Sequence, residues 1–195
     1  MKRMNNKRGT LVLFTGSSGV GKGTVMGELY KLSDKIKLSV SNTTRPPRKG
    51  EIDGVHYNFV TTEQFKKLIE EDGYLEYAGY CGKYYGTPKR QVEELLDAGY
   101  DVFLEIEVKG GLQIMEKYPE VLSIFLLPPS MEELETRLRG RGTESEDVIQ
   151  ERLRQASEEI KYKNHYKYRV INDDAQRAAA EVFDILNNYK DSKEN

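Results

Sequence analysis

The sequence predicts a three-layer α/β/α domain with a central parallel sheet. Short apolar runs rich in strand-forming residues recur at 10–15, 100–108 and 121–127, and segments with helical spacing separate them. Strands that are apolar along their whole length are typical of parallel sheets, because helices cover both faces of such a sheet. The first run leads through a glycine-rich turn at 16–23 into a helix, which is the opening of a βαβ-type unit.

The first predicted helix carries four apolar residues on one face. These are Val25, Met26, Leu29 and Leu32. From 36 to 60, prolines, glycines and alternating residues indicate short strands and turns. A helix is predicted over 61–69, because Thr61 and Gln64 have the spacing of a capping box ahead of apolar residues.

Later helices are indicated by their end signals. Thr87 and Pro88 are predicted to open a helix that Gly99 ends, because proline suits the first helical position and glycine the residue after the last turn. Ser130 and Glu133 form a second capping box directly after two prolines. The remaining elements are a strand at 168–172 and a final helix at about 175–189.

Two segments interrupt the alternation of strands and helices, at about 39–87 and about 130–157. We therefore expect a core made of 9–38, 88–129 and 158–189 with two insertions. Inserted flaps of this kind are typical of enzymes that close over two substrates. The ends of the chain, 1–8 and 190–195, are predicted to be flexible tails.

Composition excludes several classes of function. The chain has 195 residues, of which 37% are hydrophobic and 32% charged, as in a soluble globular domain. Its net charge of −2 lacks the basic excess of a protein that binds a nucleic-acid polymer. The two histidines, His56 and His165, lack the spacing of zinc ligands. The single cysteine, Cys81, cannot form an internal disulfide and is predicted to be a half-buried thiol without a catalytic role.

The N-terminal region does not predict export. Residues 1–9 are basic and polar, and the apolar run at 11–14 is too short for a signal-peptide core or a membrane span. We therefore expect a cytoplasmic protein that does not contact a membrane.

A phosphate-binding loop is the strongest single motif. It comprises Gly16, Ser17, Ser18, Gly19, Val20, Gly21, Lys22, Gly23 and Thr24. Two glycines five apart and then a lysine, at a strand-to-helix junction, define a P-loop. The glycines let backbone N–H groups point at phosphate oxygens, the helix N-terminus favours the anion, and Lys22 supplies a mobile charge for the β- and γ-phosphates of a nucleoside triphosphate. An ordinary glycine turn is the less favoured interpretation, since an apolar strand precedes the loop and an amphipathic helix follows it.

The loop departs from the common pattern after the lysine. Gly23 stands where many P-loop proteins have the Ser or Thr that binds Mg²⁺, and Thr24 comes one residue later. We expect Thr24 to reach a phosphate oxygen, and Mg²⁺ to be held mainly by the nucleotide and water, with no assigned protein ligand.

Residues 39–59 identify a second nucleotide site. They read Ser-Val-Ser-Asn-Thr-Thr-Arg-Pro-Pro-Arg-Lys-Gly-Glu-Ile-Asp-Gly-Val-His-Tyr-Asn-Phe. This segment closely resembles the guanylate kinase signature S-x-T-T-R-x-P-R-x-G-E…G-x-x-Y-x-F. The segments around Glu76, at 82–87, 139–144 and 171–174 match the same family, so the resemblance covers residues 9 to 189.

The resemblance implies how GMP is bound, and the side-chain chemistry agrees with it. The groups implied to hold the GMP phosphate are Arg45, Arg48, Tyr57 and Tyr85. Guanidinium forks suit bidentate phosphate binding. Glu76 matches the family's base reader, and a carboxylate there accepts from both guanine N1–H and N2–H₂; Ser41 and Thr87 are the matching hydroxyls. Adenine lacks this donor pair, so such a site can discriminate by roughly 10⁴-fold.

Two carboxylates follow the strand predicted at 100–108. Glu105 and Glu107 are two residues apart and are predicted to share one strand face near the P-loop. Glu107 matches a family position that is usually Asp, and the resemblance implies a contact with GMP, Lys22 or Mg²⁺ waters. Lys109 replaces a common Gln.

The lid segment carries arginines that match the family's catalytic positions. These are Arg137, Arg141 and Arg152. Phosphoryl transfer gathers negative charge, which arginines on a closing lid neutralise. For Arg139 and Arg154 we favour a solvated helix face. Asn172 resembles the family's adenine-contacting residue, and a strand-ending turn residue is an equally favoured interpretation.

Together these residues predict an enzyme that transfers the γ-phosphate of ATP, with Mg²⁺, to GMP and also to dGMP. No general base is needed, because the acceptor phosphate is already anionic. Two alternatives remain. One is a guanylate-kinase-like module that binds proteins, against which the intact Gly16, Gly21 and Lys22 argue. The other is a P-loop kinase for AMP or UMP, against which Glu76 and the 43–45 segment argue.

Overall fold

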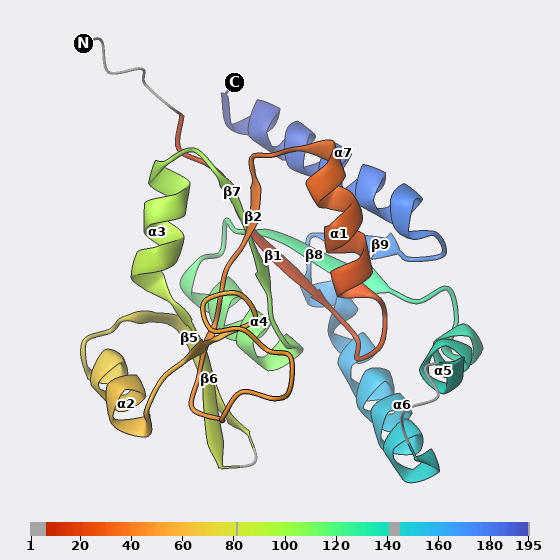
Figure 1. The fold of residues 1–195 in the computed structure, drawn as a ribbon. Helices are drawn as coiled ribbons and strands as arrows, with labels where there is room; N and C mark the ends of the chain where they lie inside the picture. Colours follow the sequence, from red (N-terminus) through yellow and green to blue (C-terminus); the bar gives the residue numbers. More distant parts are fainter. Residues whose placement is uncertain (1–6, 81, 141–144, 195) are drawn as a thin grey trace.

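A five-stranded sheet with strand order β2-β7-β1-β8-β9 forms the centre of the computed structural model (Figure 1). The structure describes residues 7–80, 82–140 and 145–194. The strands of this sheet are β1 (Leu11–Gly16), β2 (Ile36–Leu38), β7 (Asp101–Glu105), β8 (Leu122–Leu127) and β9 (Tyr168–Ile171). Each neighbouring pair runs parallel, which confirms the predicted parallel sheet.

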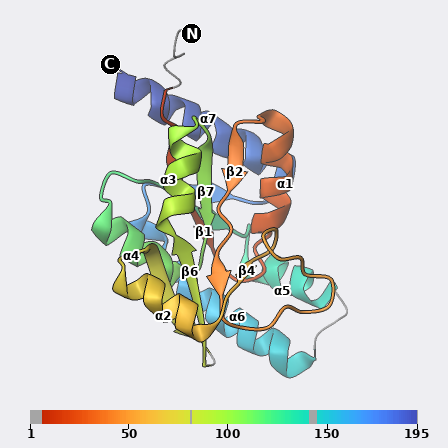
Figure 2. The ribbon, with the colours of Figure 1, turned by 60° about the vertical axis from the view of Figure 1, so that its left-hand side comes forward.

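Helices cover both faces of this sheet and make it the middle of three layers. They are α1 (Lys22–Leu32) and α7 (Ala175–Glu194) on one face, and α3 (Lys89–Asp97) and α4 (Val108–Lys117) on the other. Figure 2 shows α3 and α1 on opposite sides of β2 and β7. Successive residues of β1 alternate between the layers: Val12 and Phe14 pack with α1 and α7, and Leu13 packs with α3 and α4.

A second, four-stranded sheet with order β4-β3-β6-β5 occupies the segment predicted as the first insertion. Its elements are β3 (Asn42–Thr43), β4 (Asn58–Phe59), α2 (Thr62–Glu70), β5 (Tyr74–Tyr80) and β6 (Lys83–Pro88). The predicted capping box is confirmed, since Thr61 and Gln64 bond to each other's backbone N–H groups. Phe65 of α2 stacks on Tyr74 and Tyr84, with ring centroids 4.4 and 5.4 Å apart, and fixes the helix to the sheet.

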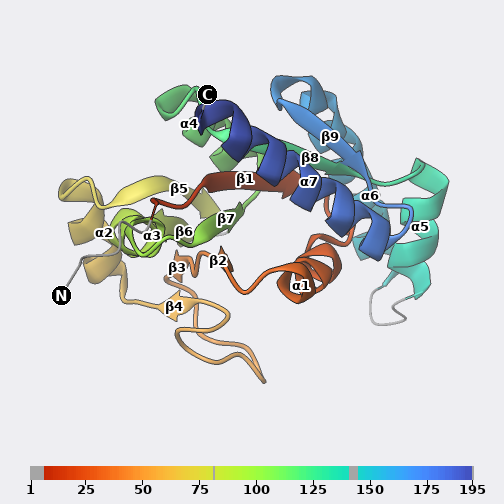
Figure 3. The same ribbon diagram turned by 90° about the horizontal axis from the view of Figure 1, so that it is seen from above.

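The second insertion contains α5 (Met131–Gly140) and most of α6 (Glu146–Ile160), which a short 3₁₀ helix (Lys161–His165) connects to β9. The two helices pack through Leu134, Leu138, Ile149 and Ala156. Seen from above, the second sheet and the α5–α6 pair lie on opposite sides of β1 (Figure 3). Among the described residues, no helix has the length and apolar composition needed to span a membrane.

The prediction of a strand over 100–108 was wrong at its C-terminal end. β7 stops at Glu105, and α4, which the sequence analysis missed, begins at Val108. The sequence does not predict α4 because Gly110 and Gly111 are poor helix formers. Both glycines lie where a side chain cannot fit. A Cβ on Gly111 would come within 2.5 Å of the Tyr166 hydroxyl oxygen.

Three details at element ends also differ from expectation. Pro88 is the N-cap residue of α3 and not its first helical residue, and the Thr87 hydroxyl donates to Glu76. Leu32 ends α1 with 46% of its surface exposed, because the helix passes the edge of the core there. The final helix continues to Glu194, beyond the tail expected from 190.

The extended α7 is held to the sheet by a buried carboxylate. Asp101, 3% exposed, accepts from the Thr10 N–H and from Lys190 Nζ, both at 2.9 Å. Lys190→Ala is expected to lower the free energy of unfolding by about 1–2 kcal/mol, because the buried Asp101 loses a charged partner. Lys193→Ala, on the same helix and 3.5 Å from the exposed Glu120, serves as the control. Equal urea midpoints for the two variants would contradict this role.

Candidate active site

The loop after β1 forms the phosphate-binding nest that the sequence predicts. Gly19 and Gly21 have φ angles of +80° and +94°, which only glycine adopts without strain. A Cβ on Gly21 would also come within 2.7 Å of Asn172 Nδ2. The residues from Gly19 to Thr24, together with Glu105, line a hollow of about 390 Å³ at the N-terminus of α1. Backbone N–H groups and a helix N-terminus gathered around one hollow favour an anion.

Lys22 is held across the loop by backbone carbonyl groups. Its Nζ donates to the carbonyl oxygens of Gly16 at 2.8 Å and Ser17 at 3.4 Å. Burial lowers the pKa of Lys22, and the nearby carboxylates of Glu105, Glu159 and Glu107 act in the opposite direction. A bound polyphosphate would supply opposite charge to this partly buried ammonium.

Asn172, the residue after β9, is bonded to the phosphate loop. The residue is 4% exposed, and its Nδ2 donates to the carbonyl oxygen of Val20 at 2.8 Å. Its own N–H donates to Leu127 O at the end of β8. This amide therefore ties the loop to the sheet, while the adenine contact that the resemblance implies stays a prediction.

Glu76 is a buried carboxylate in the second sheet. It is 6% exposed, and its Oε1 accepts from the hydroxyl of the fully buried Thr87 at 2.6 Å. Burial raises the pKa of Glu76, and the bond from Thr87 opposes that rise. The hydroxyl fixes one oxygen, so the carboxylate has a set direction for reading paired donors.

The affinity for GMP is expected to fall as the pH drops towards the raised pKa of Glu76, because only the ionised carboxylate accepts from both guanine donors. An exposed carboxylate would lose its charge only at lower pH. Isothermal titration of GMP between about pH 8 and about pH 5.5 measures the effect. An identical slope in Glu76→Gln would show that another group is titrating.

Gly110 of α4 lies against this carboxylate. A Cβ at that position would come within 2.6 Å of Glu76 Oε2. Gly110→Ala is therefore expected to turn Glu76 away and raise KM for GMP by about 10–100-fold, since small misplacements in a site can cost that much. Gly27→Ala is the control, because its Cβ meets nothing within 4 Å on α1. An unchanged KM for GMP in Gly110→Ala would contradict the assigned approach.

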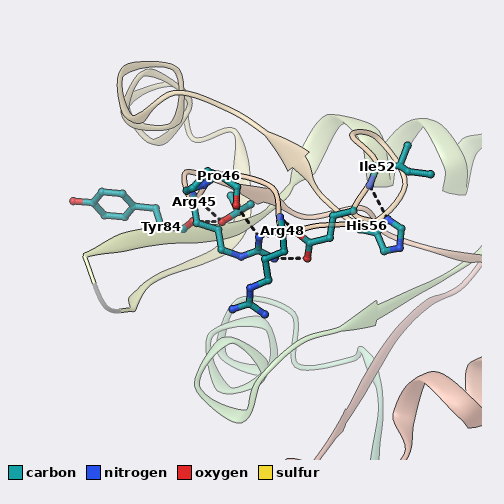
Figure 4. Close-up of polar contacts among 8 residues, drawn as sticks. Arg45, Pro46, Arg48, Ile52, His56 and Tyr84 are labelled. Atoms are coloured by element: carbon teal, nitrogen blue, oxygen red, sulfur yellow. Dashed lines mark hydrogen bonds and ion pairs between the residues drawn. The ribbon is translucent and has the colours of Figure 1, made fainter. Parts of the chain in front are cut away.

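Arg45 is paired with a carboxylate of its own loop. Its NH1 and NH2 atoms donate to the two oxygens of Glu51, both at 2.6 Å, and Glu51 also accepts the Arg48 N–H at 2.7 Å (Figure 4). The ion pair lowers the pKa of Glu51 to about 2. The guanidinium carbon lies 5.1 Å from the ring centroid of Tyr57. Glu51 thus holds Arg45 as a planar fork over an aromatic ring, the arrangement in which a guanidinium also binds a phosphate.

Four further residues predicted to bind GMP lie in β6, directly before β3 and β4, or on the loop between β3 and β4. The rings of Tyr57 and Tyr85 meet edge to face with centroids 6.0 Å apart, and burial raises the pKa of Tyr57. The Arg48 side chain extends out from the loop, as Figure 4 shows. The backbone oxygen of Ser41 accepts from Asn58 and connects the chain before β3 to β4.

A cleft of about 540 Å³ joins the phosphate loop to the second insertion and to Glu107. Its lining includes Gly16, Ser18, Gly19 and Lys22 from the loop side, and Asp147, Val148, Glu151, Arg152, Gln155 and Glu159 from α6. Glu107 is the N-cap residue of α4 and not a strand residue, so it does not share a strand face with Glu105. Both carboxylates nevertheless lie beside Lys22, as predicted.

The predicted lid arginines have different surroundings. Arg152 lines the cleft, and Arg137 Nε donates to Glu133 at 3.0 Å one turn earlier on α5. Arg139 and Arg154 pair with surface glutamates, in keeping with the solvated face favoured for them. Arg141 and Cys81 lie outside the described residues.

Three functional candidates were missed by the sequence analysis: Glu51, Glu159 and Gly110. Glu51 lies inside the signature segment quoted above, and its position three residues after Arg48 was a usable signal. The N–H of Ser18 donates to Glu159 over a separation of 141 residues, which no local pattern reveals.

The parallel sheet, the glycine nest after its central strand and the partly buried lysine at the start of α1 define a P-loop nucleotide-binding protein. Comparison with known proteins narrows the class. The model of the family "Guanylate kinase" matches residues 7–189, and the chain belongs to the guanylate kinase family.

Individual relatives agree with this assignment. The chain is 48% identical to a guanylate kinase of Desulfitobacterium hafniense, with 94% of this chain and 92% of the relative covered. It is 54% identical to one of Streptococcus agalactiae, with 93% and 87% covered. The crystal structure of guanylate kinase from Anaplasma phagocytophilum superposes with a TM-score of 0.73 at 34% identity and covers 94% of this chain and 87% of that one.

Proposed function

We propose that this protein transfers the γ-phosphate of ATP to GMP, and also to dGMP, giving ADP and GDP. The observation that carries the proposal is the cleft of about 540 Å³ that the phosphate loop and Glu107 line together. The nest for a donor polyphosphate shares Gly19 and Lys22 with this cleft. Glu76 belongs to the acceptor side. The negative charge of Glu107 helps to raise the pKa of Glu76, which links the acceptor side to the cleft. Donor and acceptor can therefore meet in line.

The acceptor side selects guanine and holds its phosphate. Glu76 accepts from guanine N1–H and N2–H₂, with Thr87 fixing the carboxylate and Ser41 contributing a hydroxyl. The phosphate is bound by Arg45, Arg48, Tyr57 and Tyr85, and Glu107 contacts GMP at the edge of the cleft. Support comes from the burial of Glu76 and from the orientation of Arg45 by Glu51.

The donor side binds ATP through the residues from Gly16 to Thr24, with Asn172 beside the loop. Mg²⁺ enters with ATP and supplies charge neutralisation at the phosphates. The side-chain oxygens of Thr24 and Glu105 at the nest suit the outer shell of a hard cation that keeps its waters. Lys22, Arg137, Arg141 and Arg152 neutralise the charge that develops on the transferred group.

Closure of the two insertions, at about 39–87 and about 130–157, brings these groups together and excludes water. Both insertions project from the same end of the core sheet, on either side of the loop (Figure 1). We assign the enzyme to purine nucleotide metabolism in the cytoplasm, with no nucleic-acid polymer or membrane as a partner.

ADP production from ATP and Mg²⁺ with GMP, dGMP, AMP, UMP and CMP in parallel tests the proposal. Turnover with GMP and dGMP far above the others is expected. Turnover with another acceptor would keep the kinase and overturn the base pocket. A folded sample that binds GMP without turnover would instead indicate a protein-binding module.

A further inference from the structure

A glutamate of α6 contacts the phosphate loop directly. Oε2 of Glu159, on the last turn of α6, accepts the backbone N–H of Ser18 at 2.9 Å. Its Oε1 accepts from Gln155 Nε2 at 3.0 Å, so both carboxylate oxygens have a donor. Hydrogen bonds from backbone N–H groups to carboxylates are among the stronger ones in proteins. A single side chain therefore fixes the distance between the loop and the helix.

This contact leaves the phosphate nest open. The nest is lined by residues from Gly19 onward, whereas Ser18 and Glu159 line the larger cleft with Lys22 and Glu107. The Ser18 residue whose N–H Glu159 accepts therefore lines the larger cleft and not the nest. Binding of a polyphosphate in the nest and the bond to Glu159 are thus compatible.

The same face of α6 carries the cleft-lining arginine. The α6 residues that line the cleft include Val148, Arg152, Gln155 and Glu159. They are spaced three or four apart, so they form one stripe along the helix. Holding Glu159 on the loop sets the rotation of the helix about its axis and so the direction in which Arg152 points.

We propose that Glu159 is a positioning residue for phosphoryl transfer, which orients the Arg152 face of α6 against the phosphate loop through its bond to the Ser18 N–H. The bond fixes the second insertion where α6 meets the phosphate loop. The proposal rests on the kinase activity proposed above.

Two variants separate the hydrogen bond from the charge. Glu159→Ala removes the acceptor and is expected to lower kcat by about 30–100-fold, since misplacement by about 1 Å can cost 10²-fold. KM for GMP is expected to stay unchanged, because Glu76 and Arg45 are untouched. Glu159→Gln keeps an acceptor oxygen and is expected to restore kcat to within about threefold of the unmodified protein. Glu158→Ala is the matched control, since the Glu158 carboxylate is bonded to the exposed Lys161 on the helix surface and does not line the cleft.

Amide hydrogen exchange at Ser18, measured without nucleotide, gives a readout that does not depend on activity. Exchange is expected to accelerate about tenfold or more in Glu159→Ala and to stay unchanged in Glu158→Ala. Unchanged exchange, unmodified kcat in Glu159→Ala, or equal losses in the Ala and Gln variants would each overturn the proposal. If the unmodified protein turns over no GMP, the proposed function fails while the exchange result still tests the contact. If Glu159→Ala does not fold, the Gln variant carries the test through its kcat and exchange rate.

Discussion

Lys22→Ala is expected to lower kcat for ATP and GMP on the order of 10³-fold, the upper range for removing one preorganised donor to a developing charge. The ammonium is partly buried at the loop and is bonded to two backbone carbonyls, and no carboxylate of the described residues pairs with it directly. Negative charge on the transferred group would give it that partner. Steady-state ADP production at saturating substrates measures the loss, which should exceed any change in KM for GMP.

Lys31→Ala is the matched control for this variant. Lys31 lies on the same helix, and its exposed side chain pairs with Glu28. The control should keep kcat within about twofold, as surface changes of this kind are nearly neutral. The role assigned to Lys22 would be wrong if the two variants turned over at similar rates, provided that both retain the fold by circular dichroism.

The parallel sheet could be predicted because its strands are apolar on both faces. Leu13, Leu104 and Ile124 at the centres of these runs are fully buried, so the apolar composition of the runs identified them. α4 could not be predicted in this way, since Gly110 and Gly111 weaken the helical pattern. Glycine is needed at these two positions because Glu76 and Tyr166 leave no room for a side chain. Both neighbours come from distant segments, which a local pattern does not contain.

The residues of the candidate site likewise fall into those that a local sequence pattern predicts and those that it does not. The phosphate loop is contiguous, so its glycines and Lys22 could be predicted from spacing. Glu76 and Thr87 could be placed together only through the family resemblance, because β5 and β6 bring them into contact by antiparallel pairing. Glu159 could be predicted neither from a contiguous motif nor from the family resemblance, since its bond to Ser18 depends on how α6 packs against the phosphate loop.

Two of the arginines predicted to act on the phosphates, one at the GMP site and one in the lid, are already paired with carboxylates in this structure. Arg45 is held by Glu51, and Arg137 by Glu133. An arginine that is already oriented loses less conformational freedom when it binds phosphate, which favours affinity. A bidentate guanidinium pair of this kind has further N–H donors to offer, so Glu51 and a phosphate can both be bound by Arg45.

Glu76→Gln is expected to reduce the preference for GMP over AMP by about 10²–10³-fold, out of roughly 10⁴-fold for a site of this kind. A carboxylate accepts from both guanine donors, whereas the amide of Gln presents one acceptor and one donor. The amide N–H₂ of Gln would face one of the two guanine donors, N1–H or N2–H₂, so one bond would be lost. The same amide would match the N1 acceptor and N6–H₂ donor of adenine. kcat/KM for GMP should therefore fall while that for AMP rises or holds.

The buried setting of Glu76 makes this change larger than it would be on the surface. The carboxylate is 6% exposed, so water cannot replace a lost bond, and an unmatched donor there costs about 1–3 kcal/mol. Glu70→Gln, at an exposed position on α2, is the control and should keep the full preference. Parallel kcat/KM values for GMP and AMP give the answer directly. A preserved ratio in Glu76→Gln would move base recognition to another residue and leave Thr87 as a partner of a merely structural carboxylate.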